Sequence, residues 1–222
     1  AGLVEKFIPF EESFGYHKRL SEEPVHVHRR DPEAKPLEGE IMVPADGWKI
    51  FWSPGQSVIL KNAVQDFLDY LERSQDVKVK VEEKNSLSEW QNLRQGIIVG
   101  TKDQLPGCGD TLKGSKDYEI RTTPEQIVIC GYDDRGAMFG LYNLEAMMNL
   151  REAPIVKVNM NTVRQSLYNN RMVLSWMGWM EWPDRLLSHL AHDGFDGIFA
   201  GVYTNPNGDR TTAENSTDFY GR

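Results

Sequence analysis

Hydrophobic and polar residues follow a regular pattern from Glu40 onward, and this pattern predicts alternating strands and helices. Residues 48–52 are apolar and aromatic enough for a strand, which the Pro54-Gly55 pair would end. Apolar side chains then recur at helical spacing over residues 58–73, a helix that Ser57 can cap. Further strands are predicted at residues 77–81, 96–100, 117–121 and 126–130, the last two joined as a hairpin.

A second helix is predicted at residues 135–150, where apolar side chains again form a stripe. Asp133 or Asp134 can cap its N-terminus and complement its dipole. Gly136 and Gly140 lie one turn apart in this helix. Because each glycine weakens a helix by about 1 kcal/mol, the pair indicates a close approach of the helix to a sheet.

The order of these elements predicts the domain organisation. Residues 1–40, rich in charges and prolines, form an irregular N-terminal segment. Residues 41–155 form an α+β domain with one mixed sheet and helices on one face. Residues 151–170 are a linker with a strand-like piece at 155–158. A β-α-β unit with parallel strands then occupies residues 166–222.

The two strands of this last unit, at residues 171–176 and 195–203, are apolar almost throughout. Two parallel strands and one helix cannot bury both faces of a parallel sheet. The pattern therefore favours a chain that is the front of a longer protein. The alternative is a compact two-stranded unit that packs onto the first domain.

Composition narrows the class of protein. The chain has 25 basic and 33 acidic residues, a net charge of −8, so it lacks the excess of Lys and Arg that binds nucleic acid or anionic membranes. No apolar run is long enough for a transmembrane helix. The first residues do not form a signal peptide. A secreted or periplasmic protein would begin in the same way after its signal peptide had been removed. This localisation is slightly favoured.

Candidate metal ligands and cysteines are few. His26 and His28 share one face of a short predicted strand at spacing that suits a metal, but no nearby His or Cys completes a site. We therefore favour a solvated strand face, with no metal and no cofactor. Cys108 and Cys130 could form one bridge, and two unpaired thiols packed in the core are the favoured interpretation.

Two segments resemble one known arrangement. GYDDRGAMFGLYNL, from Gly131 to Leu144, resembles the turn and helix that end the small α+β domain of glycoside hydrolases of the β-hexosaminidase, O-GlcNAcase and α-glucuronidase types. NRMVLSW, from Asn170 to Trp176, resembles the first strand of the catalytic (β/α)8 barrel that follows there. The hexosaminidase strand carries Arg-Gly and then an Asp, which this chain lacks; Arg-Met followed by Trp is nearer the α-glucuronidase strand.

The resemblance covers residues 41–203 and implies a fold and an activity. The fold would be the α+β accessory domain followed by the truncated start of a (β/α)8 TIM barrel. The activity would be cleavage of oligo- or polysaccharides by carboxylates on later barrel strands. This chain would then hold no catalytic residue and be inactive alone. Asp133, Asp134 and Glu145 are predicted to cap a helix or lie on its solvated face.

Sugar-binding residues are predicted where barrel strands end, because barrel sites lie at the C-terminal ends of strands. Flat aromatic side chains stack on sugar rings, and the Arg matches one that binds sugar hydroxyls in the hexosaminidase pattern. Packing between helix and sheet remains an alternative for the tryptophans, and an ion pair for the Arg. The candidates are Arg171, Trp176, Trp179, Tyr203 and Asn205.

Two other functions stay open. The chain could be a non-catalytic module that binds carbohydrate or packs against another domain. It could also be an interaction fragment that self-associates through its C-terminal strands, because unpaired strand edges bind other strands. The expected partner in the favoured interpretation is a carbohydrate substrate, with no nucleic acid and no membrane.

Overall fold

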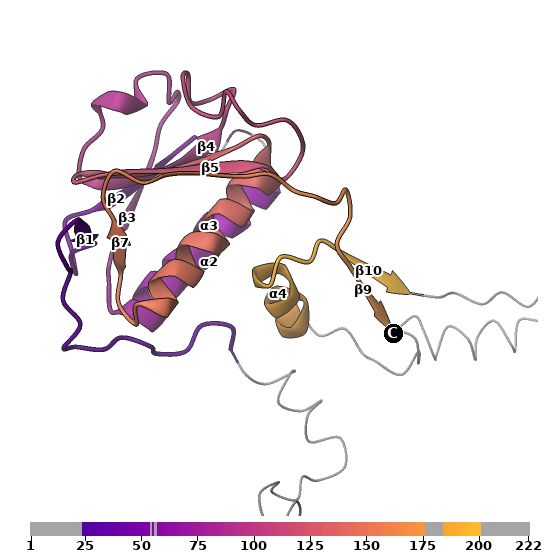
Figure 1. Ribbon diagram of the computed structural model, residues 1–222, viewed down its shortest axis with the longest axis horizontal. Helices are drawn as coiled ribbons and strands as arrows, with labels where there is room; N and C mark the ends of the chain where they lie inside the picture. Colours follow the sequence, from indigo (N-terminus) through magenta and orange to yellow (C-terminus); the bar gives the residue numbers. More distant parts are fainter. Residues whose placement is uncertain (1–23, 54, 56, 176–183, 201–222) are drawn as a thin grey trace, which may run out of the picture. The chain divides into compact units, whose positions relative to one another are not determined.

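A computed structural model describes residues 24–53, 55, 57–175 and 184–200 (Figure 1). The chain divides into two compact units, one formed by His26–Asn169 and the other containing residues 170–200 of the described part. No helix in the described ranges has both the length and the apolar character needed to cross a bilayer.

The first unit is built on one mixed sheet, as the sequence predicts, and this sheet has six strands. Its strands are β2 (Lys49–Trp52), β3 (Lys80–Glu83), β4 (Gly96–Thr101), β5 (Tyr118–Thr123), β6 (Gln126–Gly131) and β8 (Asn161–Arg164). Their order across the sheet is β3-β2-β4-β6-β5-β8. β5 runs antiparallel to β6 and to β8, and the other neighbours are parallel.

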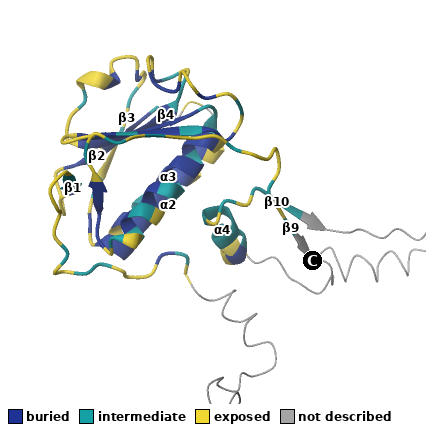
Figure 2. Ribbon diagram, in the orientation of Figure 1, coloured by how far each residue is buried: buried dark blue, intermediate teal, exposed yellow. Residues whose placement is uncertain are grey.

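Two long helices, α2 (Val58–Gln75) and α3 (Asp134–Leu150), cover one face of this sheet (Figure 1). Ser57 caps α2 as predicted, because its Oγ accepts a hydrogen bond from the Leu60 amide at 3.1 Å. The apolar sides of both helices and one face of the sheet form the main core, the dark blue layer between them in Figure 2. Fully buried Phe67 of α2 and Leu141 of α3 belong to it.

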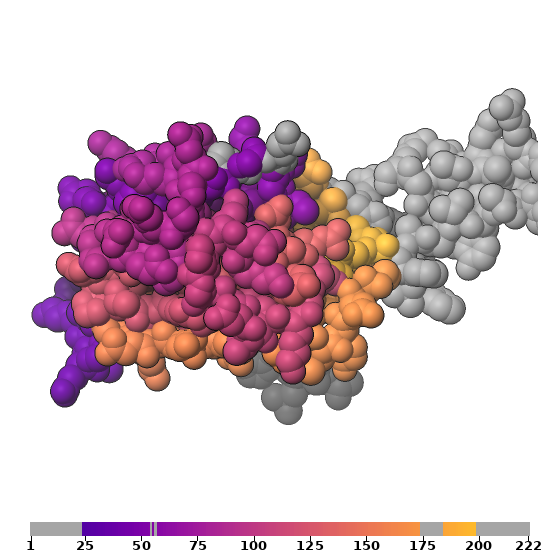
Figure 3. Space-filling view, turned by 90° about the horizontal axis from the view of Figure 1, so that it is seen from above, coloured from indigo at the N-terminus to yellow at the C-terminus, as the bar shows by residue number. Residues whose placement is uncertain are grey.

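The opposite face of the sheet is covered by loops and a short 3-10 helix, η1 (Trp90–Asn92). Strand residues that alternate with those of the main core, among them Ile98 and Val128, form a second apolar cluster there with Trp90. Cys108 and Cys130 are buried in this cluster as free thiols, the favoured interpretation of the sequence. Figure 3 views this side, with residues of the loops spread over it in magenta and pink.

The start of α3 is held tightly against the sheet. Asp133 is the N-cap, and its Oδ1 accepts a hydrogen bond from the Gly136 amide at 2.8 Å. A Cβ on Gly136 would lie 2.2 Å from the backbone oxygen of Asp117, and one on Gly140 would lie 2.5 Å from Cγ2 of Ile129. The prediction that these glycines mark a close approach is confirmed.

We expect Asp133→Ala to lower the free energy of unfolding by about 1–2 kcal/mol, a typical cost for a lost N-cap. Asp133 also binds the loop before β5, since it accepts from Ser115 Oγ at 2.6 Å and the Lys116 amide at 3.2 Å. Burial opposes its charge, but these hydrogen bonds and that of Gly136 lower the pKa of Asp133 below its usual 3.8.

Urea denaturation at pH 7 measures this loss, with Asp134→Ala as the matched control. Because the folded pKa of Asp133 is depressed, its stabilisation is present above the unfolded pKa and is lost as the pH falls through the folded value. The wild-type and Asp133→Ala stabilities should therefore converge below about pH 4. An equal loss for Asp134→Ala would contradict a specific capping role.

Three details of the first unit differ from the sequence analysis. β3 begins at Lys80 rather than at residue 77, because Val77 packs in the core and the Lys78 amide bonds to Ala45 O before the chain pairs with β2. The predicted linker contains β8, which pairs with β5. A further strand, β1 (Glu40–Met42), pairs antiparallel with β7 (Ile155–Lys157) in a separate two-stranded sheet.

The second unit contains a strand, a helix and a strand: β9 (Met172–Ser175), α4 (Asp184–His192) and β10 (Gly197–Ala200). β9 and β10 are parallel, with Met172 opposite Gly197 and Ser175 opposite Ala200. This is the β-α-β arrangement predicted from the sequence. Two strands do not by themselves show a barrel, so the (β/α)8 fold stays a prediction.

Candidate functional site

The parallel pairing of β9 and β10 brings the C-terminal ends of both strands to one edge. Ser175 and Ala200 are register partners there. Loops at such an edge carry the ligand-binding groups in parallel α/β folds. Four of the predicted sugar-binding residues follow these strands in sequence, outside the described residues, and their roles stay predictions: Trp176, Trp179, Tyr203 and Asn205.

Arg171, the fifth predicted sugar-binding residue, lies at the other edge of the two strands. Its amide donates to Asp196 Oδ1 at 2.8 Å, and its carbonyl accepts from the Asp196 amide at 2.9 Å. The guanidinium lies beside Gly194, where a Cβ would be 3.4 Å from Arg171 Nη1. Arg171 and Asp196 thus join the starts of β9 and β10, and a contact of Arg171 with sugar stays a prediction.

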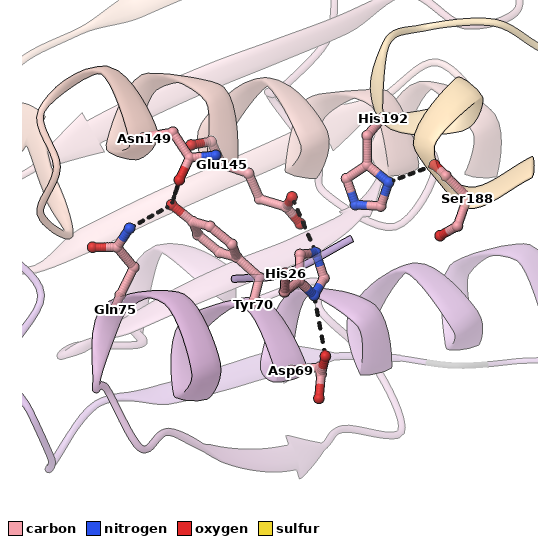
Figure 4. Close-up of polar contacts among 8 residues, drawn as sticks. All are labelled: His26, Asp69, Tyr70, Gln75, Glu145, Asn149, Ser188 and His192. Atoms are coloured by element: carbon pink, nitrogen blue, oxygen red, sulfur yellow. Dashed lines mark hydrogen bonds and ion pairs between the residues drawn. The ribbon is translucent and has the colours of Figure 1, made fainter. Parts of the chain in front are cut away.

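A buried polar cluster lies between α2 and α3 in the first unit. The His26 side chain lies between the two helices in Figure 4, and it is 6% exposed. Its Nδ1 is 3.2 Å from Asp69 Oδ2 on α2, and its Nε2 is 3.6 Å from Glu145 Oε2 on α3. Glu145 is 3% exposed. One imidazole therefore connects the N-terminal segment to both helices.

These carboxylates control the protonation of His26. Burial alone would lower the pKa of the imidazole, but the hydrogen bond and charge of Glu145 oppose it, together with the charge of Asp66 and the hydrogen bond of Asp69. The balance raises the pKa of His26 above 6.5. These carboxylates therefore stabilise the protonated form of the buried imidazole.

A neutral hydrogen-bond network continues from this cluster along the two helices. Tyr70 Oη lies 3.2 Å from Glu145 O and 3.1 Å from Asn149 Oδ1, both of which can accept its proton, and it accepts from Gln75 Nε2 at 3.0 Å (Figure 4). Burial, reinforced by the charge of Glu145, raises the pKa of the Tyr70 phenol. Tyr70 is therefore a neutral link between α2 and α3, and it packs edge-on against His26 with ring centroids 5.5 Å apart.

Two sequence-based expectations are wrong in this cluster. His26 is not on a solvated strand face: it is buried, and residues 25–28 form no strand. Glu145 is not on the solvated face of its helix, because it faces His26. The predicted exposure is found only for His28, whose side chain is 62% exposed and bonds to Asp76 Oδ2 at 3.0 Å. The carboxylates lie 40 or more positions away from His26 along the chain, so the local sequence around His26 does not indicate that it is buried.

Comparison with known proteins supports the fold. No family model matches the sequence, and no curated protein matches it. Among solved structures, a family GH115 4-O-methyl-α-glucuronidase with specificity for decorated arabinogalactans is similar over 78% of this chain and 28% of its own, at 11% identity and a TM-score of 0.53.

Two further structures give the same result. The GH84 protein CpGH84D is similar over 89% of this chain and 36% of its own, at 14% identity and a TM-score of 0.55. The GH20 β-N-acetylhexosaminidase of Streptomyces coelicolor A3(2) is similar over 79% and 35%, at 15% identity and a TM-score of 0.50. This chain spans about a third of the length of these proteins. At such identities the likeness establishes a fold that occurs in glycoside hydrolases.

Proposed function

We propose that this chain is the N-terminal portion of a glycoside hydrolase that acts on oligo- or polysaccharides. The observation that carries the proposal is the order of its parts: a mixed-sheet α+β unit that leads, at Asn169, into a parallel β-α-β unit. The fold likeness to the GH115, GH84 and GH20 structures supports it. In this proposal β9, α4 and β10 are the first elements of a (β/α)8 barrel.

Hydrolysis of a glycosidic bond needs a general acid and a second carboxyl group that acts as base, nucleophile or substrate-positioning group. Three described carboxylates of the first unit have structural partners instead. Asp133 caps α3, Glu145 contacts His26, and Glu119 forms an ion pair with Arg121. We therefore place the catalytic pair on barrel strands beyond Arg222, and expect the 222-residue chain to be inactive alone.

The sugar would bind at the edge where β9 and β10 end. Trp176 and Trp179 follow Ser175 in sequence and would offer flat apolar faces to the pyranose ring. Tyr203 and Asn205 follow β10 and would supply polar contacts. Because Arg-Met followed by Trp resembles the α-glucuronidase strand, a uronic acid is the favoured sugar and N-acetylglucosamine the second.

We expect a chain extended past Arg222 along its own coding sequence to cleave an aryl α-glucuronide or an aryl β-N-acetylglucosaminide. The 222-residue chain should show only background release of the aryl group. In the extended chain, Trp176→Ala should reduce kcat/KM at least about tenfold, the effect of losing roughly 1.4 kcal/mol of aromatic contact.

Tyr168→Ala, which removes an exposed aromatic residue of the first unit, is the matched control and should leave kcat/KM unchanged. An extended chain that cleaves neither substrate would overturn the proposal. A different result would support the carbohydrate-binding module instead. In that case the extended chain would be inactive, and the 222-residue chain would bind sugar and lose this binding in Trp176→Ala.

A further inference from the structure

Three side chains of metal-ligating type converge inside the first unit, and this arrangement is independent of the proposed glycosidase activity. One ligand atom from each of His26, Asp66 and Glu145 lies within 4.8 Å of those of the other two. The distance from His26 Nε2 to Glu145 Oε2 is 3.6 Å. Ligand atoms about 3.4 Å apart are expected around a tetrahedral ion whose bonds are about 2.0–2.1 Å long. Small side-chain movements would therefore allow all three groups to bind one ion.

The other nitrogen of His26 already has the partner that metal-binding histidines use. Its Nδ1 is 3.2 Å from Asp69 Oδ2, and Asp69 Oδ1 in turn accepts from Arg73 Nε at 2.5 Å. A carboxylate that accepts the Nδ1 proton orients the ring, and it fixes the tautomer that forms when a bound ion displaces the proton from Nε2. This places the electron pair of Nε2 on the side of Glu145.

The elements hold the groups in place. Asp66, Asp69 and Arg73 recur at three- and four-residue spacing, which puts them on one face of α2. Glu145 extends from α3, and the contact of the two helices is part of the main core. His26 and Glu145 are nearly fully buried, whereas Asp66 is partly exposed.

We propose that His26 Nε2, Asp66 and Glu145 form a binding site for one divalent transition-metal ion of the Zn²⁺ class, with Asp69 as the positioning residue for His26. Two carboxylates supply a charge that equals that of the ion, and the imidazole nitrogen favours zinc over Mg²⁺ or Ca²⁺. Water would complete the coordination. The ion would join the N-terminal segment to α2 and α3. The carboxylates come from distant positions, which explains why the sequence pattern predicts no metal.

The direct test is titration of the 222-residue chain, freed of metal by a chelator, with ZnCl2 against a chromophoric competitor at pH 7.5. We expect one Zn²⁺ per chain, and no displacement by millimolar Mg²⁺. His26→Gln and Glu145→Gln should each weaken binding at least about 100-fold, and Asp69→Asn about tenfold, the usual effect of losing an outer partner. His28→Gln is the matched control, because His28 is exposed and two positions away, and it should bind as the wild type does.

Circular dichroism establishes that each variant is folded, and a second measurement does not depend on the variants. In wild-type protein, the ¹⁵N resonance of His26 Nε2 should move when Zn²⁺ is added, while that of His28 should not. A dissociation constant for Zn²⁺ above about 100 μM would overturn the proposal, because structural zinc sites bind far more tightly. Equal losses for His28→Gln and His26→Gln would do the same, as would zinc binding that leaves the His26 resonance unchanged.

Discussion

Gly136→Ala should reduce the free energy of unfolding by about 3 kcal/mol, the upper end of the usual cost of overpacking. At an open helix position the same change stabilises a protein by about 1 kcal/mol, because alanine favours the helix. Here the new Cβ would lie 2.2 Å from Asp117 O and 3.1 Å from Gly131 Cα, which are backbone atoms. Backbone cannot rotate away as a side chain can, so α3 must move from the sheet, and the clash outweighs the helix propensity.

Two other glycines make the test quantitative. Gly140→Ala should cost less, because its new Cβ meets a side-chain atom, Ile129 Cγ2, at 2.5 Å. Gly114→Ala is the matched control: it lies outside a helix, nothing is within 4 Å of its Cβ position, and its φ is not positive. Urea denaturation of the three variants should give losses in the order Gly136, Gly140, Gly114. A Gly136→Ala protein as stable as the wild type would show that the helix can shift at little cost.

Glu145→Gln should destabilise the metal-free protein by about 3 kcal/mol near pH 5.5, because removing one partner of a buried ion pair leaves the other charge without compensation. The loss should shrink as the pH rises. Since the folded pKa of His26 is raised above 6.5, the stabilisation from its charge is fully present below the unfolded pKa. This stabilisation is lost as the pH rises through the folded pKa. Above that pH the imidazole is neutral, so replacing the carboxylate of Glu145 by an amide removes no ion pair.

Urea denaturation in the presence of a chelator at pH 5.5 and 8.5 measures this difference, and the chelator separates it from metal binding. Asp76→Asn is the control, since it removes the partner of His28 at the surface, where an ion pair contributes about 0–1 kcal/mol. Its effect should be small at both pH values. A loss for Glu145→Gln that is equal at both pH values, or larger at pH 8.5, would be inconsistent with a charged His26 in the folded state.

Much of the fold could be predicted because its elements have strong local signals. The Ser57 cap, the stripes of the two helices and the Pro124-Glu125 hairpin turn each depend on neighbouring residues only. β8 could not be predicted in this way: it is an edge strand in which only Val163 is apolar, and it forms because β5 offers it hydrogen bonds. The predicted start of β3 was three residues too early for a related reason. Val77 fits the alternating pattern of the strand, but it packs in the core before the chain pairs with β2.

The buried cluster shows where sequence reasoning ends. His26 lies in a segment with many charged residues, and alternation around it gives no indication of burial. Its environment is set by Asp69 and Glu145, which lie 43 and 119 positions further along the chain and meet only when α2 and α3 pack together. The edge formed by β9 and β10 was easier to predict, because a strand-helix-strand pattern with apolar strands implies parallel pairing.

The charges on β3 have a consequence for the behaviour of this sheet in crowded solution. β3 is an edge strand, and Glu82 on it binds Lys49 Nζ at 2.6 Å and Lys84 Nζ at 2.5 Å. The hydrogen bond from Lys49, followed by that from Lys84, lowers the pKa of Glu82 to about 2, so the edge keeps these charges even in acid. A strand from another molecule would have to displace this hydrated row of charges before it could bond to the backbone. The edge is thereby protected against fibrillar aggregation.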